Sequence, residues 1–232
     1  MRKKQESIKK SFAKKNNSKK TPMKKSLKKA LLLISGGIDS PVAGKLLQEK
    51  GFELKAIHFS QKPFTDDSPE KKCLKLCKML GLKELIVVEA GEALKEISNK
   101  THAEYYFVLM KRLMMRVSER IAKEKRMNFL ATGESLGQVS SQTLSNLNTI
   151  NQSTKMEILR PLLFKNKQEI IDLSKKFRYY EESIGKEACD ILASSRPKTI
   201  TNTKEVEEEE KKCNIETLVE KTKKTITLKR TN

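Results

Sequence analysis

The chain lacks the marks of a secreted or membrane protein. None of its apolar runs is long enough to span a bilayer, it begins without a signal peptide, and only four cysteines occur among its 232 residues. These absences argue for a soluble protein in a reducing compartment, so we expect a cytoplasmic protein with no membrane partner. A chain of this length can bury one sizeable core but hardly two.

Acidic side chains are almost absent from the first 29 residues. This segment holds 13 Lys or Arg residues and a single carboxylate, Glu6, so most of the formal net charge of +20 lies there. Its few apolar residues form no helical stripe, and we therefore predict a disordered basic arm over 1–29. RNA is the natural partner of such an arm, through phosphate contacts that do not read sequence. A merely solvated lysine-rich tail is the alternative.

From residue 30 onward, segments typical of strands and helices alternate. Apolar runs predict five strands, at 30–34, 52–59, 85–88, 129–132 and 157–159. Helical spacing and start signals predict four helices, at 41–50, 68–80, 103–126 and 167–177. This alternation predicts an α/β fold, with a parallel five-stranded sheet covered by helices on both faces. Ligands of such sheets bind at the carboxyl ends of the strands.

After about residue 200 the composition turns polar. Residues 207–210 are all glutamate, and 221–230 are basic and rich in threonine. We predict a charged C-terminal tail over 201–232, either a loosely attached helix or a disordered segment. No internal repeat is visible in the chain.

The most informative segment follows the first predicted strand, and two common nucleotide motifs are missing from it. Ile34 runs into Ser35-Gly36-Gly37-Ile38-Asp39-Ser40 and then Pro41. No Gly-Lys-Ser/Thr follows the glycines, as a Walker loop requires, and the Gly-x-Gly-x-x-Gly spacing of dinucleotide folds is absent. Ser40 suits a helix N-cap and Pro41 the first turn, while the glycines let backbone N–H groups approach a ligand.

These N–H groups and the helix N-terminus together predict an anion site sized for a phosphate. An ordinary glycine turn between a strand and a helix is the alternative. The pattern Ser-Gly-Gly-x-Asp-Ser resembles the PP-loop of ATP pyrophosphatases. Enzymes with that loop cleave ATP between the α- and β-phosphates and adenylate a carbonyl oxygen.

A second polar segment follows the predicted strand at 129–132. Its sequence over 133–144 is Gly-Glu-Ser-Leu-Gly-Gln-Val-Ser-Ser-Gln-Thr-Leu, which offers hydroxyls and amides at a strand end. Taken alone, it is either a hydrogen-bonding surface or a simple connector. Together with the PP-loop, it resembles the tRNA 4-thiouridine synthetase family, also called tRNA sulfurtransferase or thiamine-biosynthesis sulfurtransferase. Further matches lie at 105–116, at Arg160-Pro161-Leu162, and at Cys189 followed by 197–199.

The resemblance covers about residues 30–200 and implies a PP-loop ATP pyrophosphatase domain of the Rossmann-like, adenine-nucleotide alpha-hydrolase-like fold. It also implies the nucleotide site. The implied ATP contacts are Leu33, Ile34, Ser35, Gly36, Gly37, Asp39, Ser40, His58, Phe59, Lys111, Arg112, Gly133 and Gln142. Asp39 is in addition the implied Mg²⁺ ligand. Lys111 and Arg112 have an alternative role on a solvated helix face, and His58 as a core histidine.

The chemistry that the resemblance implies is an ATP- and Mg²⁺-dependent sulfur transfer. The C4 oxygen of uridine 8 in tRNA is adenylated, and sulfur then replaces it to give 4-thiouridine; sulfur supply for the thiazole of thiamine is a related role. Asp39 and Cys189 are the implied catalytic residues, because a thiolate-type sulfur is needed. Cys213 is either a resolving or an incidental thiol, and Cys73 and Cys77 are expected in the core.

Some expected features of the family are missing from this chain. Its members carry a THUMP domain before the PP-loop, and some carry a rhodanese domain with the persulfide cysteine. Others bind an iron–sulfur cluster through a Cys-x-x-Cys that would fall near 107–110, where no cysteine stands, so no cluster is expected. We therefore expect tRNA, a cysteine desulfurase or other persulfide donor, and a separate THUMP protein as partners. Another PP-loop ligase or amidase, and a non-catalytic ATP- or RNA-binding remnant, are the alternatives.

Overall fold

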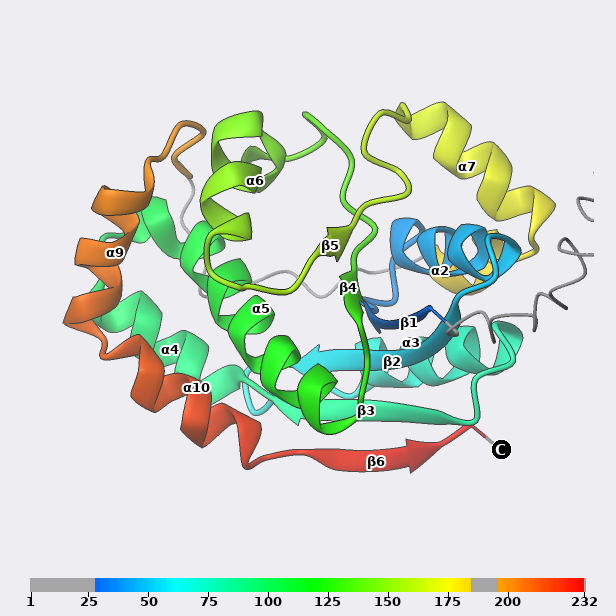
Figure 1. The fold of residues 1–232 in the computed structure, drawn as a ribbon, viewed down its shortest axis with the longest axis horizontal. Helices are drawn as coiled ribbons and strands as arrows, with labels where there is room; N and C mark the ends of the chain where they lie inside the picture. The colour runs from blue at the N-terminus through cyan, green and yellow to red at the C-terminus, as the bar shows by residue number, and fades with distance from the viewer. Residues whose placement is uncertain (1–27, 185–195, 232) are drawn as a thin grey trace, which may run out of the picture.

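A six-stranded sheet organises the part of the chain that the computed structural model describes, residues 28–184 and 196–231 (Figure 1). The strands are β1 Lys29–Leu33, β2 Glu53–Ser60, β3 Glu84–Glu89, β4 Phe129–Ala131, β5 Ile158–Leu159 and β6 Thr227–Arg230. Their order in the sheet is β5-β4-β1-β2-β3-β6. The first five strands run parallel, and β6 pairs antiparallel with β3.

Apolar side chains of the central strands alternate between two cores. In β1, Leu31 belongs to one buried cluster while Ala30 and Leu32 belong to the other, and β3 divides its side chains in the same way. This follows from the two-residue period of a strand, because successive side chains point to opposite faces. Strands buried on both faces must be apolar almost throughout, which explains the continuous runs that reveal them in the sequence.

Helices cover both faces of the sheet. One core is closed by α2 Asp39–Glu49, α3 Ser68–Met79, α7 Lys167–Lys176 and the residues around α8 Tyr180–Ser183. The other core is closed by α4 Gly91–Lys100, η1 Ala103–Tyr105, α5 Tyr106–Glu124, α6 Leu144–Asn151, α9 Thr203–Lys212 and α10 Ile215–Lys223. A further short turn, η2, spans Ser140–Gln142. No helix of the described residues is both long and apolar enough to cross a membrane.

The predicted fold class is confirmed: a mostly parallel sheet lies between two helical layers, with a sixth, antiparallel strand, β6, beyond the five predicted. Each predicted strand and helix is present within a few residues of its expected limits. Helices α4 and α6 were not predicted. Helix α6 is short, and its N-terminus is fixed by the Thr143 side chain, which accepts a hydrogen bond from the N–H of Asn146.

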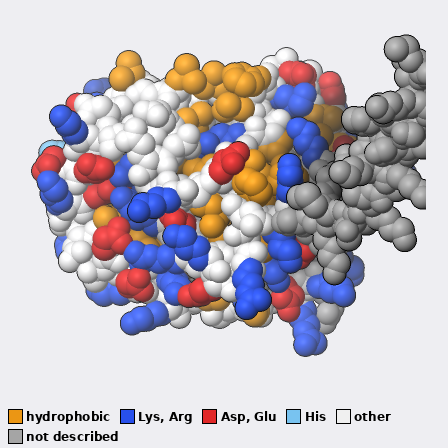
Figure 2. All heavy atoms as spheres, viewed as in Figure 1, with side chains coloured by type: hydrophobic (Ala, Val, Ile, Leu, Met, Phe, Trp, Pro, Cys, Tyr) orange, Lys and Arg blue, Asp and Glu red, His pale blue; other side chains and the backbone are white. Residues whose placement is uncertain are grey.

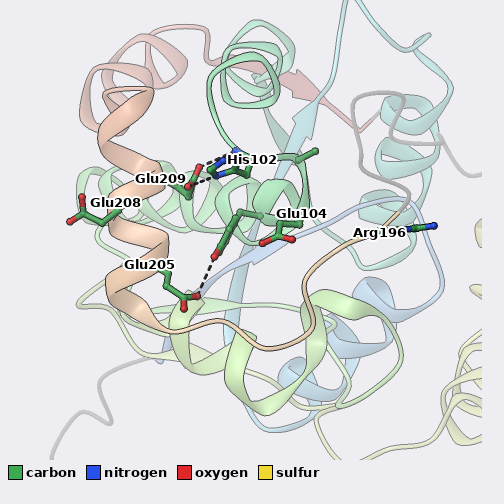
Figure 3. Close-up of a pocket in the computed structure, with 8 residues that line it drawn as sticks. His102, Glu104, Arg196, Glu205, Glu208 and Glu209 are labelled. Atoms are coloured by element: carbon green, nitrogen blue, oxygen red, sulfur yellow. Dashed lines mark hydrogen bonds and ion pairs between the residues drawn. The ribbon is translucent and has the colours of Figure 1, made fainter.

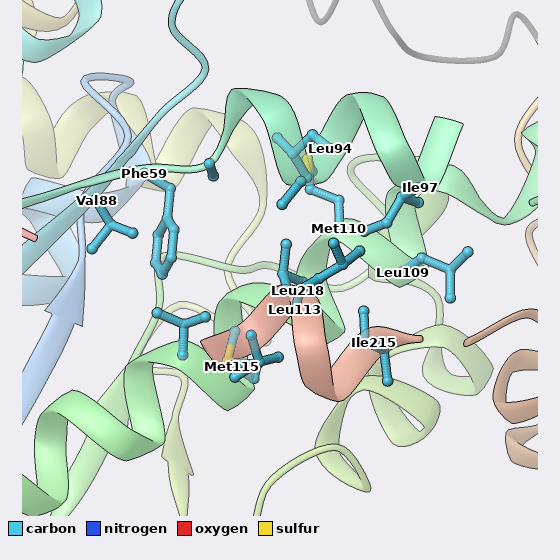
Figure 4. Close-up of a cluster of buried hydrophobic side chains, with 14 of the residues drawn as sticks. Phe59, Val88, Leu94, Ile97, Leu109, Met110, Leu113, Met115, Ile215 and Leu218 are labelled. Atoms are coloured by element: carbon cyan, nitrogen blue, oxygen red, sulfur yellow. The ribbon is translucent and has the colours of Figure 1, made fainter. Parts of the chain in front are cut away.

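The expectation of a loose or disordered C-terminal tail is wrong for the residues that the structure describes. Val206, Cys213, Ile215, Leu218 and Val219 are buried in the same cluster as the apolar side of α5, as Figure 4 shows for Ile215 and Leu218. The segment then adds β6 to the edge of the sheet. Its polar composition hides this packing, because Glu210 and Glu209 of α9 are buried against Arg112 and His102, which lie 98 and 107 positions earlier in the chain.

Candidate functional site

The carboxyl ends of β1, β2 and β4 meet at one cavity of about 430 Å³, a volume within the usual range of small-molecule sites. Twelve of the residues predicted as ATP contacts line it: Leu33, Ile34, Ser35, Gly36, Gly37, Asp39, Ser40, His58, Phe59, Lys111, Gly133 and Gln142. Two predicted site residues are not among them. Arg112 lies on another side of α5, and Cys189 falls outside the described residues.

The PP-loop connects β1 to the N-terminus of α2. Helix α2 begins at Asp39 with Ile38 as its N-cap, so the prediction of Ser40 as N-cap is wrong by two residues. Ser40 instead closes the loop, since its Oγ accepts a hydrogen bond from the Ser35 N–H at 3.2 Å. Pro41 lies in the first turn as predicted, where its missing N–H costs nothing. The first N–H groups of a helix have no partner within the helix, and Asp39 and Ser40 of this turn line the cavity.

Two glycines are required by the geometry of this site. Gly36 has φ +83°, a conformation that residues with a side chain rarely adopt. A Cβ on Gly133 would lie 2.6 Å from the Ser40 backbone nitrogen, which shows how closely the β4 end packs on the start of α2. Because Gly133 has no side chain, the end of β4 packs directly on the start of α2, and the ends of β1 and β4 line the same cavity.

His58 is held by the loop rather than exposed to solvent. Its Nδ1 lies 3.1 Å from the Ile34 carbonyl oxygen and 3.4 Å from Cys73 Sγ. Burial lowers the pKa of His58, and the hydrogen bond to Ile34 offsets part of that effect. The ring is therefore neutral at pH 7, and it lines the cavity while remaining part of the packed interior.

Lys111 extends from α5 to the cavity and is held there by a buried carboxylate. Its Nζ lies 3.2 Å from Glu134 Oε1, while Glu134 Oε2 accepts from Arg160 Nε at 2.8 Å and from Thr132 Oγ1 at 3.0 Å. Burial alone would raise the pKa of Glu134, but Lys111 and Arg160 outweigh it and bring the pKa to about 2. Glu134 is therefore a permanent anion at pH 7.

Arg112 follows Lys111 directly but turns away from the cavity. Its side chain is fully buried and binds both oxygens of Glu210, at 2.7 and 2.9 Å, and the Thr149 carbonyl oxygen. The geometry therefore supports a structural role for Arg112, and the predicted contact with a nucleotide finds no support. Consecutive helix positions point about 100° apart, so only one of the two basic side chains can reach the cavity.

A further lysine reaches the PP-loop from α7. Lys167 Nζ lies 2.9 Å from Asp39 Oδ1, so α7 is tied to the beginning of α2 by an ion pair. Both side chains are partly exposed, which leaves this pair accessible to a ligand in the cavity. Asp39 is the carboxylate of the PP-loop, and it lines the cavity together with the glycine turn.

Sequence reasoning did not identify Glu134, Arg160 or Lys167 as site residues. Glu134 and Arg160 stand within matched motifs but meet only in the folded chain. Lys167 does carry a local signal. It occupies the first position of a helix, where the helix dipole disfavours a cation. A basic residue at such a position suggests a tertiary partner, which here is Asp39.

Three buried polar atoms near the cavity have no hydrogen-bond partner within the described residues. They are Gln142 Oε1, Gln138 Nε2 and Arg160 Nη2. Buried polar atoms are nearly always satisfied in folded proteins. Because Gln142 lines the cavity, its orphaned oxygen fits a ligand that donates a hydrogen bond there.

A second pocket, of about 690 Å³, lies between η1 and α9 (Figure 3). Its lining is mainly acidic, and its carboxylates are already engaged: Glu209 lies 2.8 Å from His102 Nδ1, and Glu205 accepts from Tyr105 at 3.2 Å. Such a surface repels phosphate groups. The cavity at the PP-loop is lined by Lys111 and by the start of α2, and Lys167 reaches its Asp39, so this cavity is the candidate site for an anionic ligand.

The described thiols are unsuited to nucleophilic chemistry. Burial raises the pKa of Cys77 to about 12 and of Cys213 to about 11, and it raises the pKa of Cys73 as well. As predicted, Cys73 and Cys77 are in the core. Cys213 is in the opposite core, so a resolving role for it finds no support. Among the described residues, no group of three or more His, Cys, Asp or Glu could hold a metal ion.

Residues 26–215 match the model of the family described as Thiamine biosynthesis protein (ThiI). A protein named "Probable tRNA sulfurtransferase" from Alkaliphilus oremlandii is 40% identical over 197 residues, which are 82% of this chain and 50% of that protein. One of the same name from Brevibacillus brevis is 41% identical over 198 residues, with 83% and 50% covered. The chain thus spans about half the length of these curated relatives.

Solved structures agree with this match. A crystal structure of a 4-thiouridine synthetase in complex with RNA and bound ATP is 31% identical, with a TM-score of 0.83, and covers 88% of this chain and 55% of that one. The structure of NMN synthetase from Francisella tularensis is 16% identical, with a TM-score of 0.55, and covers 81% and 84%. At that identity, the second structure supports the fold alone.

Proposed function

Because the chain belongs to the Thiamine biosynthesis protein (ThiI) family, we propose that it is the catalytic part of an ATP-dependent tRNA sulfurtransferase. ATP binds in the cavity at the PP-loop, and the C4 oxygen of uridine 8 in tRNA attacks its α-phosphate. Pyrophosphate leaves, and sulfur then replaces the adenylated oxygen to give 4-thiouridine. Supply of sulfur for the thiazole of thiamine is a second role of the same chemistry.

The observation that carries this proposal is the arrangement around the cavity. The glycine loop and the start of α2 offer backbone N–H groups, Lys111 lines the cavity from α5, and Lys167 of α7 reaches Asp39 at the edge of the same cavity. N–H groups and lysines are suited to phosphate oxygens and to the charge that develops on departing pyrophosphate. Glu134 holds the Lys111 ammonium in place through an ion pair at 3.2 Å, so that the cation is already positioned when the reaction begins.

Asp39 suits the Mg²⁺ that accompanies ATP. Magnesium in nucleotide sites binds one or two carboxylates together with phosphate oxygens, and Asp39 offers a partly exposed carboxylate beside the glycine turn. The chemistry that an ion held by Asp39 would supply is neutralisation of charge on the phosphates. Lys167 now pairs with Asp39, and if it contacted the phosphates of bound ATP instead, the Asp39 carboxylate would be available to hold the ion.

The second half of the reaction needs a sulfur nucleophile. A hydrosulfide, or the terminal sulfur of a persulfide, forms the C–S bond at C4 while the C4–O bond breaks and AMP leaves with both bonding electrons. If the sulfur arrives as a persulfide, its S–S bond is then reduced by a further thiol, which ends in a disulfide. Cys189 carries this sulfur in our proposal, because the described cysteines are buried with raised pKa values.

The partners in this proposal are tRNA, a cysteine desulfurase or other persulfide donor, and a separate THUMP protein that helps to dock the tRNA. The basic segment 1–29 is proposed to contribute phosphate contacts.

The test combines purified chain, an unmodified tRNA transcript, ATP, Mg²⁺ and sulfide, followed by nuclease digestion and mass spectrometry. We expect 4-thiouridine, with AMP and pyrophosphate formed in equal amounts. Asp39→Asn and Lys167→Met abolish the product, whereas Lys176→Met, an exposed residue at the other end of α7, retains it.

If wild-type chain forms no 4-thiouridine, even with a cysteine desulfurase and a THUMP protein added, the proposal is wrong. ATP cleavage driven by a small carboxylate would then indicate an amidating or ligating enzyme. Rapid alkylation of Cys77 or Cys213 in the folded protein would contradict the assignment of the sulfur-carrying thiol to Cys189.

A further inference from the structure

Exposed apolar side chains gather at one side of the cavity. Seven large hydrophobic side chains of the described residues are exposed, and the three most exposed are Phe164 at 86%, Ile200 at 74% and Leu144 at 69%. Together with Val139, at 54%, they form a surface that we name the apolar rim. Leu228, equally exposed at 54%, lies on β6 and provides a comparison elsewhere in the fold.

Hydrogen bonds join the three segments that carry the apolar rim. The Leu136 N–H donates to the Leu163 carbonyl at 2.9 Å, which places the loop before η2 beside the loop of Phe164. Thr143 Oγ1 donates to the Thr199 carbonyl at 2.7 Å, which places the start of α6 beside Ile200. Figure 2 shows hydrophobic side chains along the upper edge of this face, over α6 and the loop that leads into α7.

The apolar rim borders the cavity at the PP-loop. Val139 belongs to the cavity lining itself. Phe164 lies in the connection from β5 to α7, and this connection is tied to the cavity at its C-terminal end. Ser135 Oγ donates to the Lys165 carbonyl oxygen at 2.6 Å, and Lys167 Nζ reaches Asp39 at 2.9 Å.

Cations accompany the apolar side chains on this connection. Lys165 and Lys167 follow Phe164 in the sequence, and both side chains are partly exposed, although Lys165 lies 3.5 Å from Glu169 and Lys167 lies 2.9 Å from Asp39. An exposed aromatic ring beside lysines is the combination by which proteins bind unpaired nucleotides, with the bases stacked on the ring and the phosphates beside the cations. A docking surface for a protein is less favoured here, because cores of protein interfaces are depleted in lysine.

We propose that the apolar rim is the surface on which unpaired nucleotides of the RNA substrate stack, with Phe164 as the stacking residue next to the reacting base. This inference rests on the proposed function. The C4 oxygen must reach the α-phosphate inside the cavity, so the base has to leave its stack in the RNA. Contact with Phe164 replaces part of the stacking that the RNA loses, and it positions the base at the cavity mouth.

The test compares Phe164→Ala, Phe164→Trp and Leu228→Ala in the full chain. Because each base stacked on an aromatic ring contributes strongly to affinity, we expect Phe164→Ala to weaken tRNA binding and to lower kcat/KM for thiolation about tenfold to hundredfold. Phe164→Trp restores both values, and Leu228→Ala leaves them unchanged. ATP affinity, measured by calorimetry without RNA, is the same in all four proteins, because Phe164 does not line the cavity.

Wild-type values for tRNA binding and thiolation in Phe164→Ala would overturn the inference while leaving the proposed function intact. A change in oligomeric state in Phe164→Ala, seen by sedimentation without loss of tRNA affinity, would overturn it too and would assign the apolar rim to protein association. If wild-type chain makes no 4-thiouridine, the proposed function fails. In that case an equal RNA affinity of wild type and Phe164→Ala also rejects the stacking surface.

Discussion

Two buried carboxylates on opposite sides of α5 are built alike and serve different purposes. Glu134 and Glu210 are each almost fully buried, and each binds two basic side chains. Glu134 binds Lys111 of α5 and Arg160 from beyond β5, whereas both partners of Glu210, Arg112 and Arg116, come from α5. Burial raises the pKa of Glu210, as it does that of Glu134, but Arg112 and Arg116 lower it further than burial raises it. Both carboxylates are therefore charged at neutral pH.

The difference lies in what surrounds each pair. The Glu210 site closes α9 onto α5, and its Arg112 side chain has no exposed surface. The Glu134 site opens onto the cavity, and its Lys111 side chain keeps 24% exposure. A fully enclosed pair can only stabilise the fold, whereas a pair with one accessible cation can hold that cation for a ligand. Adjacent residues, Lys111 and Arg112, thus have separate functions.

The largest expected effect is on folding. Arg112→Met leaves Glu210 buried with Arg116 alone, and we expect the free energy of unfolding to fall by about 3 to 5 kcal/mol, the usual result of breaking a buried ion pair from one side. Urea denaturation measures this loss. A decrease below about 1 kcal/mol, as is typical of surface pairs, would show that the two carboxylate sites are less different than we argue.

The second effect is on the ligand. Lys111→Met removes one charged hydrogen-bond donor from the cavity, and we expect ATP affinity to fall about 10- to 100-fold, which corresponds to about 1.5 to 3 kcal/mol. Its loss of stability is smaller than that of Arg112→Met. Calorimetric titration with ATP measures the affinity, and Lys123→Met, an exposed change on the same helix, is the control. Equal ATP affinity in both variants would contradict a role of Lys111 in the cavity.

Acid should reduce the stabilising contribution of both buried carboxylates, and the pKa of Glu134 sets the pH range over which its contribution is lost. Its pKa is about 2 in the folded protein against an ordinary value of 4.5, so its stabilising contribution is complete above about pH 4.5 and is lost as the pH falls toward 2. The difference corresponds to about 3 kcal/mol. Urea midpoints between pH 3 and pH 5 should fall less steeply for Glu134→Gln than for wild type. Parallel curves would show that Glu134 does not titrate in this range.

The smallest effect is expected at the surface. Arg120 also extends from α5, but its partners Glu216 and Glu220 are more than half exposed. We expect Arg120→Met to change the free energy of unfolding by at most about 1 kcal/mol, because solvent screens exposed pairs. This variant is therefore the matched control for Arg112→Met, and a loss as large as that of Arg112→Met would argue against burial as the cause.

Much of the site could be predicted because it depends on local pattern. Ser35 to Ser40 follow an apolar run, Gly133 follows another, and parallel strands bring their carboxyl ends to one edge of the sheet. The orientation of Lys111 relative to Arg112 could not be predicted, because both are basic positions of one helix. Their roles depend on Glu134 and Glu210, which stand 23 and 98 positions away along the chain.

The sequence by itself determined the α/β fold class, the alternation of strands and helices that leads to a parallel sheet, and the glycine loop at the end of the first strand. Short-range periodicity and turn chemistry carry that information. Only the tertiary structure decided that α9, α10 and β6 complete the fold, that Lys167 joins Asp39, and that the apolar rim borders the cavity. These features arise from contacts between segments far apart in the chain, and the free energy of burying a charge or exposing an apolar side chain depends on which segments meet.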